Sequence, residues 1–146
     1  MTESSNNHYG PTAARAHGRP GRETRSASTT IDIHAHAAVP EAAAFAAPHL
    51  DPSTIPLAHF ATPETQALNR KQEADRREVM TGIEPRLRDL DAAGIDVQVV
   101  APPPGQCYFT LRPEHAVPAI RMVNDGMAAF VARRPDRLVG LGTVPM

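Results

Sequence analysis

The chain of 146 residues has few aromatic residues, a single cysteine and almost no net charge. The one cysteine, Cys107, excludes a disulfide framework within the chain and any zinc or iron–sulfur site built from several thiolates. Lys and Arg number 15 against 16 Asp and Glu, and this net charge of −1 argues against a protein that binds nucleic acid through phosphate contacts. No apolar run approaches the roughly 18 residues of a membrane-spanning helix, so we expect no membrane segment.

The first 28 residues lack the side chains from which a core is built. Apart from Met1 they contain no Val, Ile, Leu, Met or Phe, so they cannot bury enough apolar surface to offset the entropy lost on ordering. We therefore predict a disordered tail over residues 1–28 and an ordered part over residues 29–146. The tail has no apolar stretch of the kind that a secretory signal needs, and we expect a cytoplasmic protein.

The ordered part alternates strand patterns with helix patterns. Alternation of β-branched and polar residues predicts the first strand, and a spacing of three and four between apolar residues predicts the helices. Thr62 with Pro63 is typical of a helix start, and Gly94 is typical of a helix end. The predicted strands are residues 29–36, 95–101 and 138–144, and the predicted helices are residues 62–80, 83–94 and 113–134, with at most a short helix over 41–47 in a proline-rich loop.

This order of elements predicts an α/β fold with a parallel sheet, because a crossover helix is needed to return each strand in the same direction. Such crossovers are usual in doubly wound sheets and in (β/α)8 TIM barrels. A complete barrel needs about 250 residues, so we predict a partial barrel made of its first three strands and their crossover helices. A small doubly wound binding domain is the alternative, but the loops after His36 and Val100 lack the glycine-rich phosphate loop that it requires.

His34 and His36 are the residues that carry candidate chemistry. Side chains two apart on a strand share a face, so both imidazoles should point the same way, with Asp32 beside them and Ile31 and Ile33 turned towards the helices. Two such imidazoles can converge on one divalent cation, with nitrogen–metal distances of about 2.0–2.1 Å. An H-x-H pair is a weak signal by itself, and a pair of structural histidines is the alternative interpretation.

Several segments together resemble a known family. The first strand resembles the first-strand H-x-H motif of the amidohydrolase superfamily. The rest resembles the aminocarboxymuconate-semialdehyde decarboxylase-like branch of that superfamily, and the resemblance covers about residues 29–146. The segments that carry it are residues 31–36, 86–99, 123–125, 130–138 and 142–145.

Members of this family are (β/α)8 barrels with a catalytic divalent metal, usually zinc, and they decarboxylate or hydrolyse cyclic, aromatic or unsaturated acids. The resemblance therefore implies a metal-dependent carboxy-lyase that acts on a small-molecule carboxylate, with His34 and His36 as metal ligands. A metal-dependent hydrolase of the same family, or an inactive truncated fragment, is the alternative. A homodimer of the full-length form stays open.

The chain also departs from the family pattern. The family completes its metal site with histidines on later strands and an aspartate near the last strand, and nothing here matches them. His49, His59 and His115 lie in no family motif. We therefore expect the chain to correspond to the N-terminal portion of such an enzyme, with an exposed strand edge and an uncovered apolar sheet face.

Two further residues are predicted to contact substrate. Decarboxylases that this chain resembles use an arginine from the region of Arg77 to bind a substrate carboxylate, although Arg70 and Arg76 compete, and a solvated helix face is the alternative. Tyr108 follows the second strand, where the loops of barrel enzymes face the substrate. Cys107 has no neighbouring base in the sequence, so we do not expect a catalytic thiol.

Overall fold

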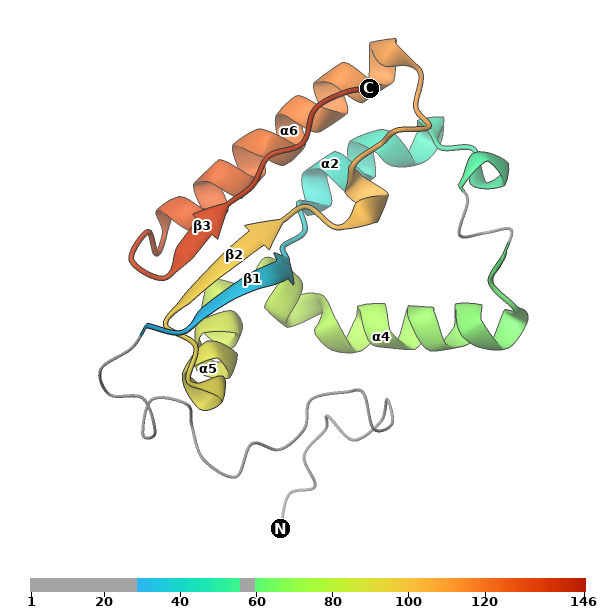
Figure 1. Cartoon of the computed structure of the whole chain (residues 1–146). Helices are drawn as coiled ribbons and strands as arrows, with labels where there is room; N and C mark the ends of the chain where they lie inside the picture. Colours follow the sequence, from blue (N-terminus) through green and yellow to red (C-terminus); the bar gives the residue numbers. More distant parts are fainter. Residues whose placement is uncertain (1–28, 56–59) are drawn as a thin grey trace.

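The computed structural model describes residues 29–55 and 60–146, so the predicted tail and His59 lie outside the described residues. Strands and helices follow one another in the predicted order (Figure 1). They are β1 (Ile31–His36), α2 (Pro40–Ala46), η2 (Ala47–His49), η3 (Pro52–Thr54), α4 (Pro63–Thr81), α5 (Ile83–Ala93), β2 (Val97–Ala101), η4 (Pro104–Gln106), α6 (Pro113–Ala132) and β3 (Leu138–Gly140).

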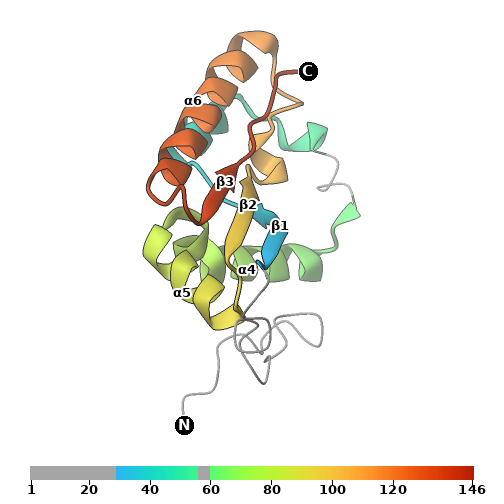
Figure 2. The same cartoon turned by 60° about the vertical axis from the view of Figure 1, so that its left-hand side comes forward.

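The strands form one parallel sheet in the order β1-β2-β3, as the alternation of elements predicts (Figure 2). β3 is shorter than predicted, because its pairing ends at Gly140. Beyond it, the side-chain amide of Asn124 donates to the carbonyl of Thr143 and accepts from its N–H, both at 2.9 Å. The last residues therefore run along α6 (Figure 1). There the Asn124 side chain makes the two backbone hydrogen bonds that a neighbouring strand would make in a sheet.

Helix ends lie where the capping residues predict them. Thr62 caps α4 by accepting a hydrogen bond from the N–H of Thr65 at 3.3 Å. α5 ends at Gly94, which has a left-handed φ of 68°, and the N–H of Ile95 then donates to the carbonyl of Leu90 at 2.9 Å. Among the helices of the described residues, none is both long and apolar enough to cross a bilayer.

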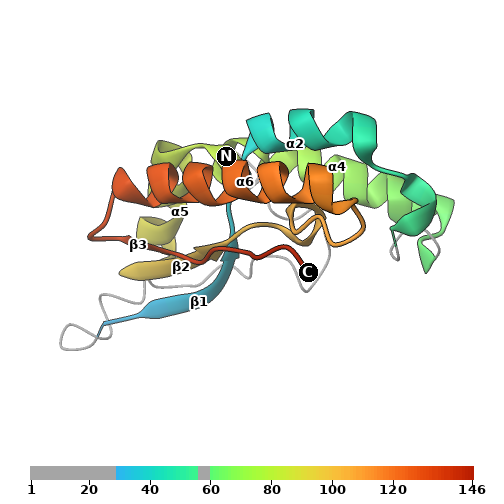
Figure 3. The same cartoon turned by 90° about the horizontal axis from the view of Figure 1, so that it is seen from above.

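All the described helices lie on one face of the sheet, as Figure 3 shows from above. The side chains of Gln98 and Val100 point into this covered face and are buried. On the other face, which we call the open face, Val139 is 48% exposed and Ile33 is 78% exposed. A doubly wound sheet carries helices on both faces, so the single covered face agrees poorly with that alternative.

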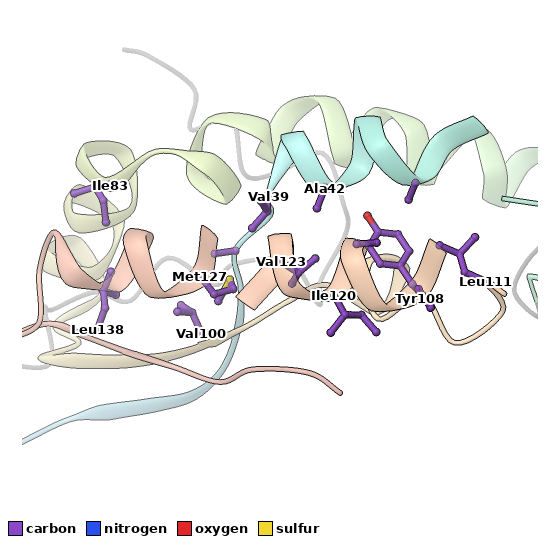
Figure 4. Packing of buried hydrophobic residues seen from close by; sticks show 14 of the residues in the cluster. Val39, Ala42, Ile83, Val100, Tyr108, Leu111, Ile120, Val123, Met127 and Leu138 are labelled. Carbon is purple, nitrogen blue, oxygen red and sulfur yellow. The ribbon is translucent and has the colours of Figure 1, made fainter. Parts of the chain in front are cut away.

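The core lies between the sheet and the helices α6, α2 and α5 (Figure 4). Val100 of β2 and Val123 of α6 are fully buried in it. α6 approaches the segment before α2 closely, because Gly126 has no side chain: a Cβ built there would lie 2.6 Å from Cγ1 of Val39. This close approach holds α2, and with it the end of β1, against α6.

Candidate metal centre

β1 brings His34 and His36 together at its carboxyl end. Their ring centroids lie 5.4 Å apart with the rings edge to face, at an interplanar angle of 86°. His36 pairs with Ala101, the neighbour of buried Val100, so its side chain leaves the sheet on the open face. His34 is exposed and His36 is half-buried, so an ion from solvent can reach both.

A hydrogen bond defines which nitrogen of His36 is available to a metal. Its Nδ1 lies 3.1 Å from the carbonyl oxygen of Pro102, the residue after β2. A carbonyl oxygen only accepts, so the proton of the neutral ring belongs on Nδ1, and Nε2 keeps its lone pair. Metal-binding histidines commonly donate their second N–H to a carbonyl in this way, which fixes both tautomer and ring orientation.

The faces of β1 differ from the regular alternation that the sequence predicts. Asp32 pairs with Gln98 but Ala35 pairs with Val100, so β1 has one extra residue between these positions, which is a β-bulge. The bulge reverses the alternation, and Asp32 turns to the covered face, where its Oδ2 accepts from Nε2 of Gln98 at 2.7 Å. The prediction that Asp32 shares the face of the histidines is therefore wrong.

The prediction for the two isoleucines of β1 is wrong for the same reason. The alternation along β1 predicts that they pack against the helices, but Ile31 is 55% exposed and Ile33 is 78% exposed. Ile31 pairs with Val97, whose face is opposite to that of Gln98. The open face therefore carries both the histidines and apolar side chains.

The donor set fits a divalent cation in part. Within residues 29–55 and 60–146, no group of three or more His, Cys, Asp or Glu side chains is placed to hold a metal. His34 and His36 thus offer two imidazole nitrogens, whereas catalytic zinc typically has three protein ligands and a water. The two histidines can therefore supply two ligands of a metal site, and its remaining ligands would have to come from outside the described residues.

A buried polar network lies directly beneath the histidines. Arg86 of α5, 3% exposed, donates through Nη2 to the carbonyls of His36 at 2.6 Å and Val79 at 2.9 Å. Its Nη1 donates to Oε1 of Gln98 at 2.6 Å. Sequence reasoning missed the role of Arg86, which it used only as the first residue of the family-like segment 86–99. A signal was present, because Arg86 lies three residues after Ile83 and four before Leu90, on the apolar stripe of α5.

The charge of Arg86 is held away from solvent. Burial lowers the pKa of its guanidinium, while the carboxylates of Asp89 and Asp32 favour the charged form. The guanidinium also lies 5.5 Å from the ring centroid of Phe130. Its Nε has no hydrogen-bond partner in the described part of the chain.

Arg77 and Tyr108 occupy different surroundings. Arg77 is exposed on α4, four residues before its end. That end lies beside the end of β1, because the N–H of Ala38 donates to the carbonyl of Met80 at 2.8 Å. Tyr108 is 4% exposed and lies in the core on the covered face (Figure 4), so the structure does not bring it to the histidines.

Two further histidines stack on each other away from any predicted motif. The rings of His49 and His115 lie 3.7 Å apart between centroids, with an interplanar angle of 9°. Phe45 lies 5.9 Å from His49. This stacking joins η2 to the first turn of α6.

Comparisons with known proteins extend this description. The chain is 30% identical over 135 residues to 2-amino-3-carboxymuconate-6-semialdehyde decarboxylase from Caenorhabditis elegans, an alignment that covers 83% of this chain and 30% of the relative. The resemblance to aminocarboxymuconate-semialdehyde decarboxylases is confirmed. No protein-family model matches the chain.

Solved structures of decarboxylases share its fold. A 5-carboxyvanillate decarboxylase from Novosphingobium aromaticivorans, complexed with manganese and a nitrobenzoic acid, superposes with a TM-score of 0.61 at 24% identity, covering 87% of this chain and 36% of that one. A dihydroxybenzoic acid decarboxylase from a Polaromonas species, with manganese and 2-nitroresorcinol, has a TM-score of 0.56 at 21% identity, covering 82% and 31%. The chain thus spans about a third of the length of these decarboxylases.

Proposed function

We propose that residues 29–146 form the N-terminal portion of a (β/α)8 barrel in a metal-dependent carboxy-lyase of the amidohydrolase type. The parallel sheet, its single helix-covered face and the similarity to decarboxylases of about three times its length support this assignment. The named relatives are decarboxylases, which favours a carboxy-lyase over a hydrolase of the same family.

One observation carries the proposal: two imidazoles meet on the open face at the carboxyl end of a strand, 5.4 Å apart. This is the end of a barrel strand at which barrel enzymes keep their catalytic groups. We propose that His34 and His36 supply ring nitrogens to a divalent ion, with Nε2 as the ligand atom of His36. Such an ion, when bound, would polarise a substrate carboxylate or lower the pKa of a bound water.

The proposed substrate is a small cyclic, aromatic or unsaturated carboxylic acid. Arg77 is our candidate for its carboxylate, since a guanidinium can form two parallel hydrogen bonds to that group and the end of α4 lies beside β1. Tyr108 is buried, so contact between its ring and a substrate would require the loop after β2 to open. We propose zinc as the ion, and the manganese in related decarboxylases makes Mn²⁺ the second ion to test.

Calorimetric titration of the metal-stripped chain with Zn²⁺, and separately with Mn²⁺, tests the ligand assignment. We expect saturable binding that the double substitution His34→Ala, His36→Ala abolishes. The double substitution His49→Ala, His115→Ala removes the same number of imidazoles from the stacked pair, and we expect it to retain binding. Undiminished affinity after loss of His34 and His36 would refute the assignment.

The reaction class needs a protein that spans the full length of the decarboxylase relatives. Metal-loaded protein should release CO₂ from at least one acid in a panel of aromatic and unsaturated carboxylates. Turnover of amide or ester substrates without release of CO₂ would instead favour the hydrolase.

A further inference from the structure

The β-bulge in β1 is what separates Asp32 from the two histidines. Three steps along β1, from Asp32 to Ala35, match two steps along β2, from Gln98 to Val100. A bulge leaves backbone groups outside the ladder of a regular sheet, so its shape depends on contacts from side chains. The positions of both imidazoles depend on this shape, because His34 lies within the bulge and His36 follows it, so the backbone path through the bulge sets the direction of both side chains.

One chain of hydrogen bonds fastens both ends of the bulge. At its start, Oδ1 of Asp32 accepts from the N–H of His34 at 3.0 Å, and Oδ2 of Asp32 accepts from Gln98 at 2.7 Å. Gln98 accepts from Arg86 at 2.6 Å, and Arg86 donates to the carbonyl of His36 at 2.6 Å. The backbone groups of both histidines are thus attached to one buried side chain through short contacts.

We propose that Arg86 is the positioning residue of the histidine pair: by joining the carbonyl of His36 to the Gln98–Asp32 link, it holds the bulge in the shape that turns both imidazoles onto the open face. This inference rests on the proposed metal site for its functional meaning. The arrangement of the two rings, however, is a property of the metal-free chain and is measured without any ion.

Arg137 provides a matched control at the opposite end of β2. It is also largely buried, with an 11% exposed side chain, and it also donates to two backbone carbonyls, those of Ile95 and Asp96, and to the Asp91 carboxylate. Arg86 likewise has two carbonyl acceptors and one side-chain acceptor. Replacement of either arginine removes a similar number of hydrogen bonds, but only Arg86 touches the histidine segment.

The test compares Arg86→Gln, Arg86→Lys and Arg137→Gln in the full chain. Imidazole ¹⁵N NMR of the metal-free protein reports the tautomer of His36. We expect wild type and Arg137→Gln to keep the proton on Nδ1, Arg86→Gln to show a mixture of tautomers, and Arg86→Lys to lie between them, since lysine can serve some of the acceptors. Zn²⁺ affinity should fall about 10-fold or more in Arg86→Gln, in line with losses of supporting hydrogen bonds at metal sites, and stay unchanged in Arg137→Gln.

Equal effects of Arg86→Gln and Arg137→Gln on the His36 spectrum would overturn the proposal and leave Arg86 a purely structural residue. If Arg86→Gln does not fold, the Arg86→Lys spectrum decides, because an unchanged tautomer there contradicts the proposal. A wild-type chain that keeps the His36 tautomer but binds neither ion would refute the proposed metal site and leave the positioning role intact, so the two failures are distinguishable.

Discussion

Tyr108 combines two unfavourable features at a single residue. Its φ of 51° lies in the left-handed region, which is uncommon for residues other than glycine. Its hydroxyl is buried without a well-aligned hydrogen bond in the described part of the chain. Burial raises the pKa of the phenol, and the Gln106 side chain acts in the opposite direction. The ring itself lies in the hydrophobic core, which also contains Leu111 (Figure 4).

We expect Tyr108→Phe to leave the free energy of unfolding unchanged or to raise it by up to about 1 kcal/mol, because it removes a buried hydroxyl without a partner and keeps the ring. Tyr108→Ala should lower it by about 3–5 kcal/mol through loss of the ring. Urea denaturation followed by circular dichroism measures both. A clear loss of stability in Tyr108→Phe would mean that the hydroxyl has a partner.

At the scale of elements, much of the structure follows from short-range signals. Thr62 and Gly94 mark helix ends that depend only on local hydrogen bonds and backbone conformation, so the sequence predicts them correctly. β3 is shorter than predicted because Asn124, distant in sequence, takes over the hydrogen bonds of Thr143. The contact between α6 and Val39 depends on a glycine in mid-helix, whose role appears only once the two segments pack together.

Gly126→Ala tests that contact between elements. The new Cβ would lie 2.6 Å from Val39, so we expect the free energy of unfolding to fall by about 1–3 kcal/mol despite the higher helix propensity of alanine. Gly105→Ala is the control, since nothing lies within 4 Å of its Cβ and the change should be near neutral. In a double-mutant cycle, Val39→Ala should recover part of the loss. An additive cycle would contradict the predicted clash.

At the scale of the whole molecule, the open face is the unusual feature. Ile31, Ile33, Val139 and Leu141 are each about half exposed or more, at 55%, 78%, 48% and 49%. Ile31 pairs with Val97 and Val139 pairs with Val99, so apolar side chains lie side by side on this face. Soluble monomers seldom expose large apolar surfaces of this kind. This agrees with the uncovered apolar face expected of three parallel strands that do not close into a barrel. The edges of β1 and β3 are likewise free of further strands among the described residues.

We therefore expect the isolated chain to self-associate or precipitate as its concentration rises. Size-exclusion chromatography over a range of concentrations measures the association. The double substitution Ile33→Thr, Val139→Thr keeps β-branched side chains on the open face, lowers its hydrophobicity and should shift the chain towards monomer. Val117→Thr, on the outer side of α6 at 36% exposure, is the control and should change little. A monomeric wild type with a sharp two-state melt would contradict this prediction.

Local chemistry in the sequence determined the order of elements, the helix ends and the placement of His34 and His36 on one strand, because these depend on residues close together along the chain. The alternation of strands and crossover helices predicts the parallel sheet. Tertiary structure alone decided which face Asp32 takes and which groups the buried Arg86 contacts. The bulge in β1 exists only against its partner strand, and the hydrogen bonds that hold it join residues 50 and 66 positions apart. A period-two pattern read along one strand contains no information about such an extra residue. The polar network of Asp32, Gln98 and Arg86 around the bulge could therefore be seen only once the chain was folded.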